Sequence, residues 1–187
     1  AIVGAAGSIG SGIAKLLAKK GALRFKLVDV ESMVTKSKLQ TLKDKLLGLR
    51  DNCDVDICFD IKEIRNSDIV IIATNSPKYI IKSQYLKPGS IIIDDSFPKN
   101  VSRELSQDRK DTILLEGGIT QFPLTIDVNV ARNVPDLMDV PLARLISCKQ
   151  TYGCFAETLI LSASGHKGNY GLGEADPRLA SDIMKKA

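Results

Sequence analysis

Four residues of this sequence have the types and spacing needed for covalent and acid–base chemistry. Cys154 and Glu157 lie in the segment CFAE, and His166, the only histidine, follows shortly after it. A thiol with a carboxylate and an imidazole nearby can form a covalent intermediate, with the histidine acting as acid and base. Lys99 follows an apolar run at residues 90–94 and could polarise a carbonyl group. The candidate catalytic residues are therefore Cys154, His166, Lys99 and Glu157.

Each of these side chains also has an ordinary structural interpretation, which stays open at this point. Cysteine is among the most buried residue types, so Cys154 is also interpretable as a core thiol on a helix face. Glu157 can be a solvated or capping carboxylate, and His166, which lies among glycines, can be a loop histidine that bonds to backbone. Lys99 can be a surface residue beside Asp95. Asp95 itself can simply cap the loop that follows the apolar run at residues 90–94.

A second group of residues has the composition of a phosphate-binding turn. Residues 4–10 read GAAGSIG, after a short apolar run at 1–3 and before apolar residues at helical spacing. Glycines let such a turn approach a pyrophosphate, and N–H groups at the helix start face its charge. The spacing G-x-x-G-x-x-G departs from G-x-G-x-x-G at Ala5. The predicted cofactor contacts in this turn are Gly4, Ala6, Gly7, Ser8, Ile9 and Gly10.

Asp29 ends the next apolar run, about 20 residues beyond the turn, where a carboxylate accepts hydrogen bonds from the adenosine ribose. This carboxylate favours NAD, because it repels the 2′-phosphate of NADP. Ser32, Lys36 or Lys38 could offset that charge, so NADP stays open as the alternative. The loop after the apolar run at residues 68–73 adds three predicted cofactor contacts, Thr74, Asn75 and Ser76.

Alternating strands and helices must position these residues. Apolar runs predict six strands buried on both faces, at residues 1–3, 25–30, 55–58, 68–73, 90–94 and 112–115. Leucines at helical spacing predict a helix over about residues 35–49 that packs on the sheet. This rhythm predicts an α/β fold of three layers, a doubly wound parallel sheet of the Rossmann type in the order 3-2-1-4-5-6. All strand-to-helix loops then meet at one edge of the sheet, where ligands bind.

The strand rhythm stops after residue 121. We expect a helix from about residue 149 to 162 and a last helix near 177–186, so that residues 122–187 form a mainly helical extension. Residues 1–121 then form the sheet core, and the whole chain is one NAD(P)-binding domain. Because residue 1 is an alanine already inside a strand, we also expect a fragment of a longer chain that lacks an N-terminal part.

The composition is that of a globular protein, with 187 residues of which 44% are hydrophobic and 26% charged. No apolar run is long enough to span a bilayer. The net charge of +4 is spread along the chain, which disfavours nucleic acid as a partner. Four cysteines without a C-x-x-C pair and a single histidine disfavour a metal site. The Rossmann-like pattern without a secretory signal favours reduced thiols in the cytoplasm.

Several motifs resemble the long-chain acyl-[acyl carrier protein] reductases, which form fatty aldehydes. They are residues 4–10, NSPK at 75–78, IDDSFPKN at 93–100, EGGI at 116–119, ID at 126–127 and CFAE at 154–157. The resemblance implies that Cys154 accepts an acyl group, as a thioester, from acyl carrier protein or coenzyme A. A nicotinamide hydride then reduces this thioester to an aldehyde. It also implies NADPH as the reductant and an N-terminal domain that helps to form the acyl pocket.

Two other functions stay open. One is a dehydrogenase of the shikimate or amino-acid type, which transfers hydride directly to a ketone or imine without a covalent intermediate. The other is a dinucleotide-binding module without catalysis of its own. The short-chain dehydrogenase mechanism is disfavoured because it requires a Tyr-x-x-x-Lys pair, and no tyrosine of this chain has a lysine four residues later.

Overall fold

The computed structural model describes residues 1–121, 149–171, 173 and 175–186. Its contacts form two compact units. The first comprises Ala1–Gly117 and Gly171–Ala180, and the second comprises Gly118–Tyr170 and Ser181–Ala187. A C-terminal segment thus belongs to the first unit. Over the described ranges, no helix combines the length and the apolar character needed to cross a membrane.

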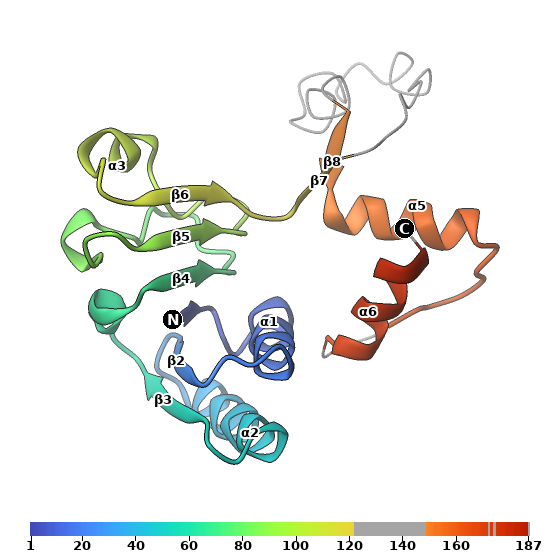
Figure 1. Cartoon of the computed structure of the whole chain (residues 1–187), viewed down its shortest axis with the longest axis horizontal. Helices are drawn as coiled ribbons and strands as arrows, with labels where there is room; N and C mark the ends of the chain where they lie inside the picture. The colour runs from blue at the N-terminus through green and yellow to red at the C-terminus, as the bar shows by residue number, and fades with distance from the viewer. Residues whose placement is uncertain (122–148, 172, 174, 187) are drawn as a thin grey trace. The chain divides into compact units, whose positions relative to one another are not determined.

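The first unit is built on one six-stranded sheet (Figure 1). Its strands are β1 Ile2–Val3, β2 Arg24–Val28, β3 Asp54–Cys58, β4 Ile69–Ile72, β5 Ile91–Asp94 and β6 Ile113–Glu116. All neighbouring strands are parallel, and their order is β3-β2-β1-β4-β5-β6. The predicted doubly wound parallel sheet in the order 3-2-1-4-5-6 is confirmed.

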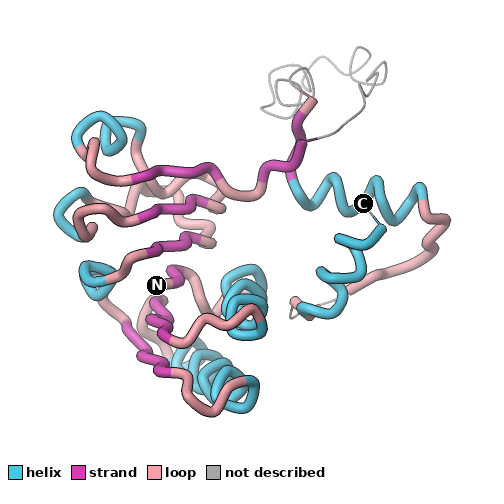
Figure 2. The backbone as a smooth tube through the Cα atoms, in the orientation of Figure 1, coloured by secondary structure: helices cyan, strands magenta, loops and turns pink. Residues whose placement is uncertain are grey.

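Helices cover this sheet because their apolar faces pack against the apolar side chains of its strands. Helices α1 (Ser8–Lys19) and α2 (Met33–Leu49) connect β1 to β2 and β2 to β3 (Figure 2). Leu39, Leu42 and Leu46 of α2 are buried in one hydrophobic cluster with Leu27 of β2. A second cluster gathers residues of β4 and β5 with the 3-10 helices η1 (Ile61–Asn66) and η2 (Ser83–Tyr85) and helix α3 (Arg103–Asp108). The sheet therefore separates two apolar cores.

The expectation that every strand is buried on both faces fails on one face of the sheet, in β4 and in the edge strand β6. Ile113 and Leu115 of β6 are 56% and 47% exposed, and Ile69 of β4 is 48% exposed. On the opposite face, Val70, Ile72 and Ile92 are fully buried. An apolar run predicts a strand, but the number of covered faces depends on which distant elements pack against it.

The second unit contains a strand pair that the sequence interpretation missed. Strand β7 (Ile119–Gln121) pairs antiparallel with β8 (Gln150–Tyr152), and helix α5 (Gly153–Ala163) follows directly. The predicted helix start near residue 149 was therefore wrong, because backbone pairing with β7 holds residues 150–152 extended. The predicted last helix is present as α6 (Pro177–Lys186).

Candidate functional site

The glycine turn between β1 and α1 is too tight for any other residue at two positions. Gly4 has a φ of +83°, and a Cβ atom placed on it would lie 2.3 Å from the Ala73 carbonyl oxygen. A Cβ on Gly10 would lie 2.3 Å from the Gly4 carbonyl oxygen. The turn therefore packs against its own helix and against the carboxyl end of β4, which leaves its outer side open for a ligand.

The start of α1 offers backbone donors to that ligand. Gly7 is the N-cap and provides no side-chain cap, and the amides of Ser8, Ile9 and Gly10 donate to no acceptor within the described parts of the chain. Open amides at a helix start, together with the helix dipole, form a site for a pyrophosphate. The predicted glycine-turn contacts therefore fit the phosphates of a dinucleotide.

A cavity of about 460 Å³ lies beside the turn, within the first unit. The turn forms one wall, and Ser37, Lys38 and Thr41 of α2 contribute to another. Pockets for cofactors and drug-sized ligands typically measure about 300–1,000 Å³. The hydroxyl and ammonium groups on the α2 side suit a polar, anionic ligand.

Gly173 and Ala175 lie against α1, an arrangement that no local sequence signal indicates. The Ser8 hydroxyl donates to the Gly173 carbonyl at 2.8 Å, and the Lys15 ammonium donates to the Ala175 carbonyl at 2.7 Å. A Cβ atom on Gly12 would lie 2.6 Å from the Ala175 Cβ, so α1 needs a glycine at this contact. Because the Ser8 hydroxyl donor is engaged, only the backbone N–H of Ser8 stays open to a ligand.

Asp29 connects the glycine turn to the end of β2. One carboxylate oxygen accepts the Ala6 amide at 2.8 Å, and the other accepts the Val30 amide at 2.8 Å. Each carboxylate oxygen has two lone pairs, so both retain capacity for a ribose hydroxyl. Asp29 thus stabilises the turn, a role that the sequence pattern did not predict.

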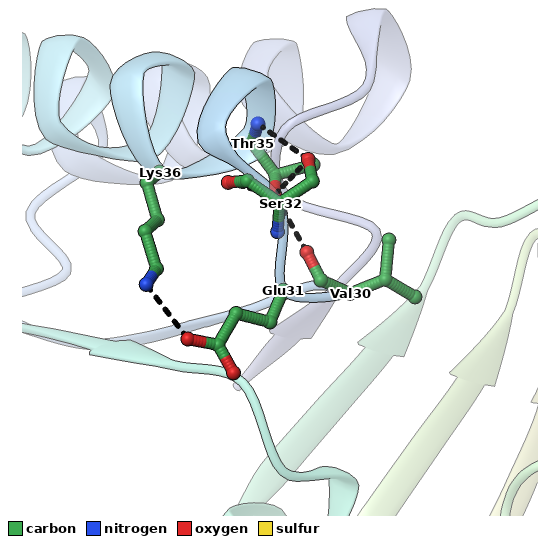
Figure 3. Close-up of polar contacts among 5 residues, drawn as sticks. All are labelled: Val30, Glu31, Ser32, Thr35 and Lys36. Carbon is green, nitrogen blue, oxygen red and sulfur yellow. Dashed lines mark hydrogen bonds and ion pairs between the residues drawn. The ribbon is translucent and has the colours of Figure 1, made fainter.

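The turn between β2 and α2 is held by a reciprocal cap (Figure 3). The Thr35 amide donates to the Ser32 hydroxyl at 3.1 Å, and the Ser32 amide donates to the Thr35 hydroxyl at 2.9 Å. The Thr35 hydroxyl also lies 2.6 Å from the Val30 carbonyl, to which it donates. Lys36, in the next position, forms an ion pair with Glu31 at 2.7 Å. Two of the residues considered for a 2′-phosphate, Ser32 and Lys36, therefore have protein partners.

The loop after β4 is organised by Asn100, which the predicted site did not include. The Asn100 side chain is fully buried and donates to the carbonyls of Ser76 at 2.9 Å and Lys78 at 3.1 Å. The Thr74 hydroxyl donates to the Asn100 side-chain oxygen, and the Ser76 amide donates to the Thr74 hydroxyl at 3.1 Å. Asn75, between them, is exposed. The three predicted contacts of this loop therefore lie on one hydrogen-bonded turn at the carboxyl end of β4.

Asp94 caps the loop after β5. Its carboxylate is 3% exposed and accepts the amides of Ser96 at 3.1 Å, Asn100 at 2.9 Å and Val101 at 2.9 Å. The neighbouring Asp95 is only partly buried, and this burial is the main cause that raises its pKa, against the lowering effect of Lys99. The two adjacent aspartates therefore have different roles.

Asp94→Asn is expected to destabilise the protein by about 3 kcal/mol. The side-chain NH2 group of asparagine would then face backbone N–H donors in place of a carboxylate oxygen that accepts from them. Urea unfolding measures this loss. Asp95→Asn is the matched control, and it should be neutral or slightly stabilising, because it removes a carboxylate whose raised pKa marks a cost of ionisation in the folded state. Equal unfolding midpoints for the two variants would contradict the assignment.

The Lys99 side chain contacts the last residues of both β5 and β6. Its ammonium donates to the Asp94 carbonyl at 3.0 Å and lies 3.1 Å from a carboxylate oxygen of Glu116. The side chain is 34% exposed, so it is anchored rather than free on the surface. An ammonium has three N–H donors, and the remaining one is available to a substrate carbonyl.

Cys154 is exposed and is the second residue of α5 in the second unit. The Gly153 amide donates to the Gly118 carbonyl at 2.8 Å, whereas the amides of Cys154 and Phe155 have no acceptor among the described residues. The interpretation of Cys154 as a core thiol is therefore wrong. Glu157 is exposed one turn further along the same helix.

His166 is exposed and lies against the edge of Tyr170, with a distance of 5.2 Å between ring centroids. The Tyr170 hydroxyl donates to Asp182, and this hydrogen bond is the largest of the causes that raise the pKa of Tyr170 to about 12. In the part of the second unit that the structure describes, no hydrogen bond joins Cys154, Glu157 and His166 to one another. These three residues belong to the second unit, whereas Lys99 and the glycine turn belong to the first.

Two comparisons bear on identity. Residues 1–80 match the lactate/malate dehydrogenase NAD-binding domain, a region that runs from β1 past β4 and includes the glycine turn and Asp29. The chain is also similar to the aminotransferase PigE of Serratia sp., with 25% identity over 173 residues. That match covers 92% of this chain and 18% of the relative, so the chain spans less than a fifth of the relative's length. The chain therefore carries an NAD(P)-binding Rossmann domain, and its first 80 residues are similar to the NAD-binding domain of lactate and malate dehydrogenases.

Proposed function

We propose that this chain is the reductase part of an NAD(P)H-dependent enzyme that converts an acyl thioester to an aldehyde through a Cys154 acyl-enzyme. The observation that carries the proposal is the exposed thiol in the first turn of α5, beside two open amides. The motifs shared with acyl-[acyl carrier protein] reductases, among them CFAE at 154–157, support the same chemistry. The ID motif at 126–127 lies outside the described residues.

The proposed reaction has two stages. The Cys154 thiolate attacks the thioester carbonyl of the substrate, a new carbon–sulfur bond forms, and the carrier thiol leaves with a proton. A dinucleotide held at the glycine turn would supply the hydride that reduces the resulting Cys154 thioester. The hemithioacetal that forms on Cys154 then collapses, which breaks the carbon–sulfur bond and releases the aldehyde and the thiolate. A thioester accepts hydride far more readily than a carboxylate, which is the advantage of the covalent route.

Each candidate residue has a defined part in this proposal. The amides of Cys154 and Phe155 stabilise the oxyanion of each tetrahedral species, as open donors at a helix start can. His166 takes the thiol proton and returns a proton to the leaving thiol, with Glu157 as a nearby carboxylate. Lys99 polarises the reacting carbonyl through its remaining donor.

The similarity to an aminotransferase supports an aldehyde as product. PigE is named as an aminotransferase, and the region that matches this chain is a small part of it. Aminotransferases transfer an amino group to a carbonyl compound, so a reductase that releases an aldehyde supplies a suitable acceptor. An acyl thioester, carried by acyl carrier protein or coenzyme A, is the substrate class that we infer.

A second candidate function rests on the family match of residues 1–80. Lactate and malate dehydrogenases are named for oxidation of hydroxy acids, and a non-covalent dehydrogenase needs the dinucleotide site without Cys154. In that case Lys99 has the main role in polarising the carbonyl, and Lys99→Ala abolishes turnover while Cys154→Ser retains it. If the chain is a dinucleotide-binding module without catalysis, it should bind NADH tightly and turn over no thioester.

Acyl transfer to the intact protein tests the proposal directly. Incubation with a series of acyl coenzyme A thioesters, from acetyl to palmitoyl, without NADH or NADPH is expected to add one acyl group to the protein mass. Addition of NADH or NADPH is then expected to remove that mass and release the matching aldehyde. Steady aldehyde production without any acyl-protein in single-turnover mass spectra would exclude the covalent route.

A further inference from the structure

The backbone of His166 is fixed to the end of α5 by a helix cap. The Gly165 amide donates to the Ser162 carbonyl at 3.0 Å, and the His166 amide donates to the Leu161 carbonyl at 3.0 Å. Gly165 has a φ of +70°, so the two bonds and the left-handed glycine form a Schellman motif. The cap therefore places the His166 backbone at a set position relative to the helix that carries Cys154. The orientation of the imidazole depends on its own side-chain contacts.

We propose that Tyr170 is the positioning residue for His166 and that it keeps the imidazole in one orientation for the Cys154 chemistry. The centroids of the two rings lie 5.2 Å apart, and the ring planes are nearly perpendicular, at 88°. Aromatic rings favour this geometry. Among the residues that the structure describes, no hydrogen bond or ion pair engages the imidazole, so the ring contact is the specific interaction that orients it. The catalytic part of this inference rests on the proposed function.

Tyr170 is itself held at two places by α6. Its hydroxyl donates to the Asp182 carboxylate, and the Lys186 ammonium lies 5.3 Å from the centroid of its ring. Asp182 and Lys186 are one helical turn apart and form an ion pair at 3.2 Å. Both belong to the second unit, as do His166 and Tyr170. The hydroxyl and the ring of Tyr170 therefore both have partners, and a ring anchored in this way supports the imidazole in one position.

The ionisation of Tyr170 indicates positioning rather than proton transfer. The hydrogen bond to Asp182 is the largest cause that raises the pKa of Tyr170 to about 12, together with burial and the charges of Asp182 and Glu157. A phenol with this pKa keeps its proton at neutral pH, so it does not compete with His166 for the proton of the Cys154 thiol. The effect of the Glu157 charge also means that this carboxylate lies near Tyr170. Tyr170 is therefore close to two of the candidate catalytic residues.

Loss of this support is expected to slow the proposed acyl transfer. A Cβ atom on Gly165 or Gly168, on either side of His166, would meet no atom within 4 Å. The loop around His166 is thus loosely packed, and a ring contact rather than burial has to orient the imidazole. A general base acts only within hydrogen-bond reach of the proton that it takes, and a displacement of about 1 Å can lower a rate by up to about a hundredfold.

Proton NMR on the intact chain, prepared without a polyhistidine tag, tests the contact. His166 is the only histidine, so its imidazole protons are assigned without ambiguity. We expect a nuclear Overhauser effect between the imidazole and the Tyr170 ring. Asp182→Asn should preserve this effect, because its side-chain oxygen still accepts from the Tyr170 hydroxyl, whereas Asp182→Ala should weaken it by about half or more. Absence of the effect in the wild type overturns the inference.

Single-turnover acylation tests the consequence. The probe is the acyl coenzyme A thioester that labels the wild type fastest, and the readout is the rate at which the intact protein gains mass. Tyr170→Leu should lower this rate about tenfold, and Asp182→Asn should stay within about twofold of the wild type. Added imidazole should restore the rate of Tyr170→Leu and of His166→Ala, a rescue that a loss of folding would not allow. Lys185→Gln, at the exposed position beside Lys186, is the matched control and should keep the wild-type rate.

The outcomes separate this inference from the proposed function. The positioning role is overturned by a wild-type rate in Tyr170→Leu, by a wild-type rate in His166→Ala, or by a loss in Tyr170→Leu that imidazole does not restore. A wild type that accepts no acyl group refutes the proposed function instead, and the NMR contact then decides alone whether Tyr170 holds His166. Urea unfolding checks that each variant is folded.

Discussion

Cys154→Ala is expected to lower aldehyde formation from an acyl thioester by about a thousandfold or more, because the variant lacks the group that forms the covalent intermediate. The acyl-protein mass should disappear at the same time. NADH affinity should stay within about twofold of the wild type, because the glycine turn that we assign to the dinucleotide belongs to the other unit. Steady-state assays, intact mass spectrometry and a fluorescence titration measure these three quantities.

Cys53→Ala is the matched control for this variant. Cys53 is partly buried, and its thiol lies 3.7 Å from the Ala22 carbonyl, to which it donates. Its loss removes a thiol of the first unit without touching α5, so aldehyde formation should persist. Full aldehyde formation by Cys154→Ala would refute the covalent mechanism. Turnover of a ketone by the same variant would then favour the direct dehydrogenase.

Gly10→Ala is expected to destabilise the protein by about 3 kcal/mol and to abolish measurable NADH binding. The new Cβ would lie 2.3 Å from the Gly4 carbonyl oxygen, 2.9 Å from the Gly4 carbonyl carbon and 3.0 Å from the Ala5 Cα atom. All three are backbone atoms, so the turn itself must move away from the helix. The open amides at the start of α1 would move with it. Urea unfolding and NADH titration measure the two effects.

Gly48→Ala is the control for Gly10→Ala, and it should stabilise the protein rather than destabilise it. A Cβ on Gly48, within α2, meets no atom within 4 Å, so the substitution adds no clash. Alanine has a higher helix propensity than glycine, which should raise stability by up to about 1 kcal/mol and leave NADH binding unchanged. A Gly10→Ala variant with the stability and NADH affinity of the wild type would show that the turn does not need the close approach seen here.

The fold was predictable because its signals are local. Each apolar run of a parallel sheet is a few residues long, and the glycine turn combines a strand end with a helix start within ten residues. The leucine stripe at 39, 42 and 46 repeats at helical spacing and packs on the sheet as expected. Strand order follows from right-handed crossovers, which restrict the possible topologies. Strand β8 was missed because it pairs with β7, which lies far away in the sequence.

The sequence by itself determined the doubly wound sheet, the dinucleotide turn and the residue types available for chemistry. Only the tertiary structure decided what several of those residues contact: Asp29 holds the Ala6 amide, Asp94 caps its loop, and Cys154 is exposed. It also revealed Asn100 as the link between two loops and Glu31 as the partner of Lys36. Periodicity and turn composition depend on neighbouring residues. Burial, ion pairs and hydrogen-bond partners depend on residues that only folding brings together.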